Sequence, residues 1–131
     1  DLESEVNAEF PGTLERHSGR VDGEAKRAVF AGSDVLCFPT RYPAEMIPTV
    51  ILDAMAFGLP VVSTSWRGIP ELVPRRGLPL CGDGRPEEVA AALEAATLFG
   101  EYEAYRSRFL EAFTAAAFIE RMSAALQSLR E

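Results

Sequence analysis

Lysine is almost absent from this chain of 131 residues. Lys26 is the only one, arginine supplies the other basic residues, and acidic residues outnumber basic ones by 20 to 13. The resulting net charge of −7 argues against nucleic acid as a partner, because proteins that bind a phosphate backbone carry a clustered basic face. It leaves room for a small anionic ligand, which needs only a few N–H donors.

Cysteine is also scarce. Cys37 and Cys81 are the only two, and no Cys-x-x-Cys or Cys/His spacing predicts a zinc site or a disulfide framework. Cys37 lies in an apolar run, so we expect a buried free thiol and a reducing compartment. The acidic start shows no secretory leader, and no apolar run reaches the roughly 18 residues of a membrane helix. We therefore expect a cytoplasmic protein.

Two short apolar runs flank an apolar helix in the middle of the chain. Residues 34–40 and 61–64 are typical of strands that are covered on both faces of a parallel sheet. Between them, Pro48 suits the first position of a helix that continues to Phe57 and ends before Gly58. This order predicts a strand–helix–strand unit. The fold class is therefore α/β, a Rossmann-like parallel sheet flanked by helices.

Weaker patterns predict the remaining elements of a single domain over residues 1–131. A helix is expected to follow an N-cap at Asp22, to carry Ala25, Ala28 and Val29 on its packed side, and to end near Gly32. The other expected elements are strands over 14–20 and 78–80, and helices over 70–73, from Pro86 to before Gly100, over 102–113 with its aromatic stripe facing the core, and from 115 onward.

Asp53 is the only charge in the apolar helix over 48–57, and a buried carboxylate needs a partner. Glu45 lies eight residues earlier, which would span roughly 12 Å in a helix. The helix N-terminus between them favours an anion, and it follows a strand of the predicted sheet. Two interpretations stay open: a ligand site, or Glu45 at the helix dipole with Asp53 paired to Arg41 or Arg67.

The segments 33–40 and 45–62 resemble the nucleotide-sugar site of the retaining GT-B glycosyltransferases, the family that includes glycogen and sucrose synthases and bacterial mannosyltransferases. They contain an aspartate before the strand, an acid-x7-acid pair, and Ala-Met-Ala-Phe-Gly-Leu-Pro-Val-Val. The segments 68–73 and 86–89 resemble the next two family elements, and 19–21 resembles the upstream glycine turn. All occur in the family order.

The resemblance implies a role for each matching residue. Glu45 would be the catalytic-site acid against the donor sugar, and Asp53 would accept hydrogen bonds from the ribose hydroxyls of a nucleoside diphosphate sugar. The other donor-binding positions would be Thr49 and Val50 at the diphosphate, Met46 and Ile47 beside Glu45, and Val21 with Gly19 near the base. Transfer would retain the anomeric configuration without a cofactor or required metal, and the sequence has no Asp-x-Asp motif.

Several departures from the family pattern affect this prediction. Asp53 is one methylene shorter than the usual glutamate, Met46 replaces a small residue, and Trp66 with Arg67 stands where relatives often carry glycine. No segment matches the family's basic pair or its acceptor-binding N-terminal domain. We therefore expect a partial C-terminal domain that meets its acceptor through that other domain and is inactive by itself.

Other functions stay open from the sequence. The chain fits another GT-B sugar reaction, such as epimerisation or phosphorolysis, or a degenerate nucleotide-binding or scaffolding module. His17, the only histidine, is expected to be structural or solvated. The apolar stripe of the last helix, from Phe118 to Leu129, could be exposed and drive formation of a homodimer.

Overall fold

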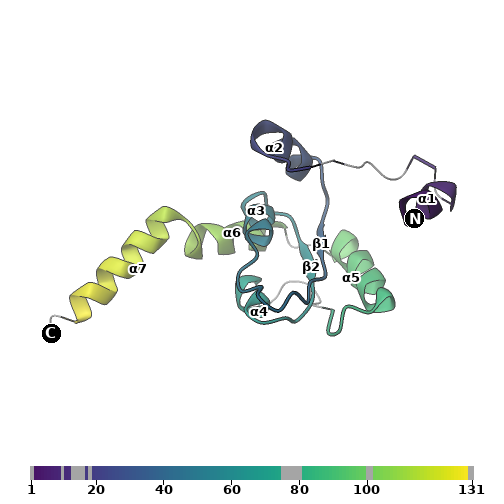
Figure 1. Cartoon of the computed structure of the whole chain (residues 1–131). Helices are drawn as coiled ribbons and strands as arrows, with labels where there is room; N and C mark the ends of the chain where they lie inside the picture. The colour runs from purple at the N-terminus through teal and green to yellow at the C-terminus, as the bar shows by residue number, and fades with distance from the viewer. Residues whose placement is uncertain are drawn as a thin grey trace.

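The computed structural model describes residues 2–9, 11–12, 17, 19–74, 81–99 and 102–129. Its helices are α1 (Leu2–Glu9), α2 (Gly23–Ala31), α3 (Thr49–Ala56), α4 (Ile69–Leu72), α5 (Pro86–Phe99), α6 (Tyr102–Ala112) and α7 (Ala115–Ser128), and its strands are β1 (Leu36–Phe38) and β2 (Val61–Ser63) (Figure 1). The mixed α/β fold with a small parallel sheet flanked by helices is therefore confirmed.

The two strands form the predicted parallel pair across α3. Their register places Leu36 opposite Val61 and Phe38 opposite Ser63. After β2, Thr64 forms a further parallel bridge with Cys81. The strand expected at 78–80 lies outside the described residues. So does most of the strand expected at 14–20, whose described residues, His17, Gly19 and Arg20, are not in a strand.

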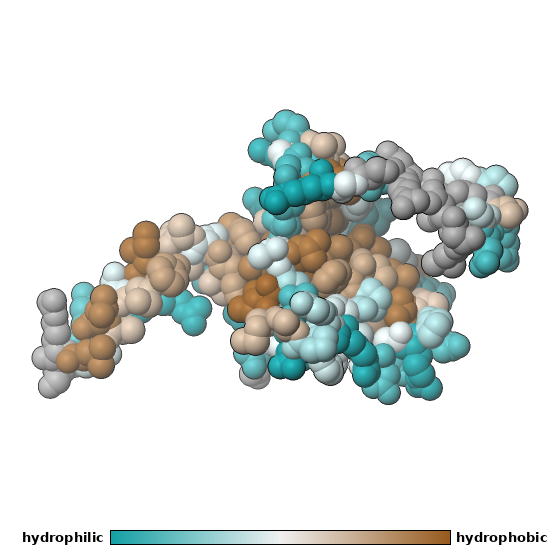
Figure 2. Space-filling view, in the orientation of Figure 1, coloured by the Kyte–Doolittle hydropathy of each residue, from teal (hydrophilic) through white to brown (hydrophobic). Residues whose placement is uncertain are grey.

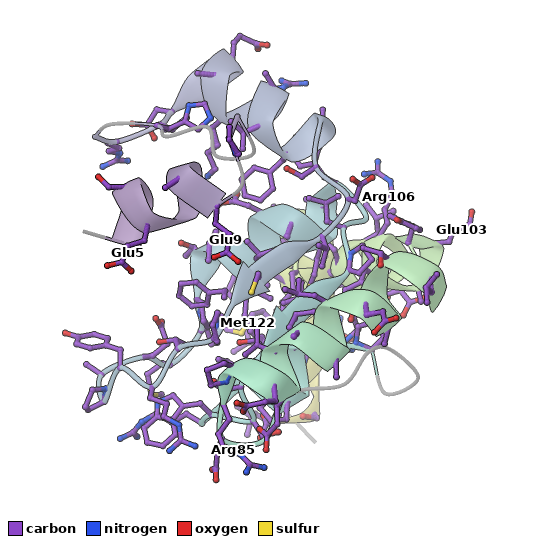
Figure 3. The ribbon with its side chains drawn as sticks, turned by 90° about the vertical axis from the view of Figure 1, so that its right-hand side faces the viewer. Glu5, Glu9, Arg85, Glu103, Arg106 and Met122 are labelled. Carbon is purple, nitrogen blue, oxygen red and sulfur yellow. The ribbon has the colours of Figure 1, made fainter. Side chains whose placement is uncertain are left out.

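One face of the sheet carries the main core. Helix α3 turns fully buried side chains toward it, and α4 and α6 add Ile69, Leu72 and the fully buried Tyr105. From α6, Arg106 donates a hydrogen bond to the carbonyl of Ala56 at the end of α3 (Arg106 is labelled in Figure 3). The predicted apolar helix and the core-facing aromatic stripe of α6 are therefore present, although Tyr102 at the start of that stripe is exposed.

The turn after α3 depends on a glycine. Gly58 has a φ of +79°, and a Cβ there would lie 3.2 Å from the carbonyl oxygen of Tyr102. Only glycine adopts this conformation without strain and also allows α6 to approach so closely. Helix α3 begins one residue later than predicted, so Pro48 is its N-cap and not its first helical residue.

The opposite face of the sheet is covered only in part. Helix α5 packs on β2, where Val62 is fully buried with Ala92 and Ala96. Cys37 pairs with Val62 and shares this face, but it is exposed, because no described helix covers β1 there. The prediction of a buried Cys37 and of a doubly covered β1 is therefore wrong, while β2 is buried throughout as expected.

The packed side of α2 also differs from the prediction. Ala25, Ala28 and Val29 are exposed, whereas Lys26 and Phe30 are partly buried. The ring of Phe30 stacks on that of Phe57, with centroids 5.6 Å apart. The contact face of α2 is therefore a mixed one, formed by a cation and an aromatic ring.

Helix α7 extends away from the rest of the molecule (Figure 1). Its N-cap is Thr114, whose hydroxyl accepts a hydrogen bond from the Ala117 amide at 3.2 Å. Hydrophobic residues lie along it (Figure 2), and Phe118, Ile119 and Met122 are at least 45% exposed. None of the described helices combines the length and the apolar character needed to cross a membrane.

Candidate functional site

An open pocket of about 350 Å³ brings α2 and the first turns of α3 together with the segment before α2. Its walls combine aliphatic and aromatic surface with charged groups of both signs. The lining residues are His17, Arg20, Val21, Asp22, Lys26, Val29, Phe30, Thr49, Val50 and Asp53. Such a mixture suits a ligand that has both a flat apolar part and polar or anionic groups.

An ion pair between Lys26 and Asp53 lies in this pocket. The Lys26 Nζ is 2.5 Å from Oδ2 of Asp53, and the two side chains are 37% and 35% exposed. The alternative in which Arg41 or Arg67 pairs with Asp53 is wrong: Arg41 pairs with Asp83, and Arg67 lies over the ring of Trp66. The positive charge of Lys26 therefore balances the negative charge of Asp53, and the Asp53 side chain is still partly exposed to solvent.

A second ion pair lies in the same pocket. The Arg20 Nε is 2.6 Å from Oδ2 of Asp22, and both side chains are largely exposed. Asp22 occupies the N-cap position of α2 as predicted, but its carboxylate makes no capping hydrogen bond to the helix. Because this pair is solvated, it is worth little to stability, and both groups can rearrange around a ligand.

Four of the eight residues expected from the sequence line the pocket, namely Val21, Thr49, Val50 and Asp53. The other four, Gly19, Glu45, Met46 and Ile47, do not. The structure therefore brings together the positions expected for the base, ribose and diphosphate. It places the acid expected at the sugar in a separate loop.

The loop that holds Glu45 follows β1. The Glu45 amide donates a hydrogen bond to the Tyr42 carbonyl at 3.0 Å, and the Glu45 side chain is half-buried. Its carboxylate forms no ion pair with any residue in the described part of the chain. Met46 and Ile47 beside it are 68% and 53% exposed, so bulky Met46 projects from the loop rather than filling a pocket.

Sequence reasoning missed the contribution of α2 to the pocket. Lys26, Val29 and Phe30 lie three and four positions apart, which places them on one face of a helix. Lys26 carried a usable signal, since it is the only lysine in the chain and lies beside a predicted apolar face. Its pairing with Asp53 depends on how α2 packs against α3, which the sequence pattern does not give.

The charged groups beside α5 have a structural role. Arg85 donates from Nε to the Glu88 carboxylate at 2.9 Å, and the Asp83 amide donates to the same carboxylate at 3.1 Å (Arg85 is labelled in Figure 3). The hydrogen bond from Arg85 lowers the pKa of Glu88. These contacts hold residues 83–85 against the start of α5, and none of the three residues lines the pocket around Asp53.

Neither cysteine is activated as a nucleophile. Although the Cys37 side chain is exposed, partial desolvation by the surrounding protein raises the pKa of its thiol, and the neighbouring Cys81 raises it further. Burial also raises the pKa of Cys81, whose Sγ donates to the Ser63 carbonyl at 3.0 Å. A thiol with a raised pKa stays protonated at neutral pH.

The fold and the pocket define an α/β domain with a short parallel sheet and an open pocket lined by charged residues. The family model described as "Glycosyl transferases group 1" matches residues 4–97 of the chain. The chain therefore belongs to this family of GT-B glycosyltransferases.

A curated relative is also a glycosyltransferase by name. The chain is similar to the sulfoquinovosyl transferase SQD2 of Arabidopsis thaliana, with 34% identity over 65 residues. The matched region is 50% of this chain and 12% of that protein. The chain thus spans a small part of the length of this relative.

Proposed function

We propose that this chain forms the donor-binding part of a glycosyltransferase that transfers a sugar from a nucleoside diphosphate sugar to an acceptor, with retention at the anomeric carbon. Family membership supports the reaction class, and the pocket around Asp53 carries the proposal for this part of the enzyme. The name of the relative states transfer of a sulfoquinovosyl group. For this chain we propose only the broader class.

Asp53 is the proposed acceptor of the ribose hydroxyls. A carboxylate accepts two hydrogen bonds from a diol well, and charge-assisted hydrogen bonds are stronger than neutral ones. The Asp53 side chain is 35% exposed, so it is accessible from the pocket. Lys26 holds this carboxylate in place, and its ammonium adds a positive charge to a pocket that would receive an anion.

The first residues of α3 are the proposed diphosphate site. Thr49 and Val50 open the helix and line the pocket, and the first amides of a helix have no intrahelical acceptor. These amides and the helix dipole favour an anion. Because Thr49 lies one helical turn before Asp53, a ligand held by both would enter with its nucleoside toward α2.

Glu45 is the proposed acid at the donor sugar. It lies in the loop that leads from β1 to α3, and this loop follows the carboxyl end of a parallel strand, where α/β sheets bind ligands. A diphosphate at Thr49 would direct its sugar toward this loop. Residues outside this chain would supply the acceptor site, so we propose that the chain alone binds the donor but does not transfer the sugar. No cofactor and no required metal are proposed.

Amide NMR spectra recorded during titration with UDP, GDP and ADP test this proposal. We expect saturable shifts of the Val21, Thr49 and Val50 amides with one preferred base. A Glu87→Gln variant, which removes an exposed carboxylate on α5, is the matched control and should bind equally well. A folded chain whose pocket amides do not respond to any of the three nucleotides at millimolar concentration would contradict donor binding and favour a scaffolding role.

A further inference from the structure

The loops that follow β1 and β2 meet at Trp66. Its Nε1 donates a hydrogen bond to the Tyr42 carbonyl at 2.9 Å, and the Glu45 amide donates to the same oxygen at 3.0 Å. The ring is partly buried and packs against the main core. One carbonyl thus fixes both the indole ring and the backbone of the acid proposed at the donor sugar.

Two arginines lie over this ring, and only one of them is already paired. The guanidinium carbons of Arg41 and Arg67 are 5.9 and 5.4 Å from the ring centroid of Trp66, which is cation–π distance. Arg41 also binds Asp83, with Nη2 2.6 Å from Oδ1 and Nε donating to the backbone carbonyl at 3.1 Å. Arg67 is exposed and forms no ion pair with the residues that the structure describes.

The backbone holds Arg67 in an unfavourable conformation. Its φ is +47°, and no other non-glycine residue among those described has a positive φ. The left-handed region costs a residue with a Cβ about 1–2 kcal/mol. Gly68 fixes the turn from the other side, because a Cβ there would lie 2.8 Å from the Met46 carbonyl oxygen. Strain of this kind persists where the surrounding structure holds it, and it is frequent at ligand sites.

We infer that Arg67, held on Trp66, binds an anionic group on the transferred sugar and selects acidic sugars as donors. This inference rests on the proposed function. The pocket that would hold the nucleoside shares no residue with the Arg41–Trp66–Arg67 group, whereas Trp66 and Gly68 both contact the loop of Glu45. The unpaired guanidinium therefore lies at the sugar end of the donor and offers two parallel N–H donors to a carboxylate or sulfonate.

The test uses two pairs of ligands, and within each pair the sugars differ only at C6, where one has a carboxylate and the other a hydroxymethyl group. UDP-glucuronic acid is titrated against UDP-glucose, and glucuronic acid 1-phosphate against glucose 1-phosphate, so that the second comparison does not depend on the base. Trp66 is the only tryptophan, so its indole N–H gives a single NMR signal. Arg67→Asn removes the charge, and asparagine tolerates the left-handed conformation. Arg121→Gln, at an exposed arginine of α7, is the control.

We expect the native chain and Arg121→Gln to bind the acidic ligand about fivefold more tightly than the neutral one, with a shift of the indole signal. Arg67→Asn should bring this ratio close to one. A ratio that Arg67→Asn leaves unchanged, or a native ratio of one, would overturn the inference even if the Thr49 and Val50 amides shift. If those amides respond to none of UDP, GDP and ADP in a folded chain, the proposed function itself is contradicted.

Discussion

Replacing Asp53 with asparagine separates a binding role of this carboxylate from a purely structural one. The change removes the 2.5 Å ion pair with Lys26 but keeps the shape of the side chain. Both partners are more than a third exposed, so the pair is screened, and exposed pairs contribute about 0.2–1 kcal/mol. We expect the free energy of unfolding to fall by no more than about 1 kcal/mol, because Lys26 keeps access to water.

The expected effect of Asp53→Asn on nucleotide binding is larger. Hydrogen bonds to a charged group contribute about 1.5–3 kcal/mol, so losing the carboxylate that receives the ribose hydroxyls should weaken binding by about tenfold or more. The two quantities are measured on one sample series, by urea unfolding and by titration with the nucleotide that the native chain prefers.

Lys26→Met completes the comparison. A double-mutant cycle with Asp53→Asn gives the coupling energy of the ion pair, which we expect at about 0.5 kcal/mol. If Asp53→Asn loses stability but binds nucleotide as tightly as the native chain, Asp53 serves only the ion pair, and its assignment to the ribose is wrong.

Three further predictions concern stability and association. Gly58→Ala should lower the free energy of unfolding by about 1–3 kcal/mol, because a Cβ meets α6 at a positive φ; urea unfolding measures this, and an unchanged midpoint would contradict the turn geometry. Since Arg85 lowers the pKa of Glu88 in the folded chain, the stabilisation from this contact is present above the ordinary pKa of 4.5 and is lost as the pH falls through the lowered value. Glu88→Gln should therefore be less stable than the native chain at neutral pH and equally stable in acid, and a difference that persists in acid would refute this. Helix α7 exposes Ile119 and Leu126, so we expect a concentration-dependent dimer in analytical ultracentrifugation that a glutamate at either position weakens; a native chain that stays monomeric at high concentration would exclude it.

The elements around the proposed diphosphate site followed well from the sequence. Helix α3 and strand β2 are specified locally, by an apolar stretch between Pro48 and Gly58 and by the run that begins at Val61. The apolar run of β2 predicted burial on both faces, and this strand is buried throughout. The resemblance also predicted the family, and the family match over residues 4–97 confirms this membership.

What the sequence did not predict depends on packing between distant segments. Cys37 lies in a strand-like run, but its exposure depends on whether a helix covers β1 on that face. Asp53 needed a cation, but Lys26 became its partner only because α2 packs beside α3. The position of Arg67 over Trp66 depends on the left-handed conformation of Arg67 and on the hydrogen bond that holds Trp66 to the loop after β1.

The central claim is that a nucleoside diphosphate binds beside the Lys26–Asp53 pair, and the only lysine of the chain offers a direct probe of it. Reductive methylation with isotope-labelled formaldehyde keeps the charge and marks Lys26, while the equally labelled N-terminal amine serves as the internal reference. We predict that the preferred nucleotide shifts the Lys26 methyl signal, saturates with the same dissociation constant as the Thr49 amide, and leaves the terminal signal in place. A Lys26 signal that stays unmoved in a folded chain, while nucleotide is present at millimolar concentration, would contradict the account.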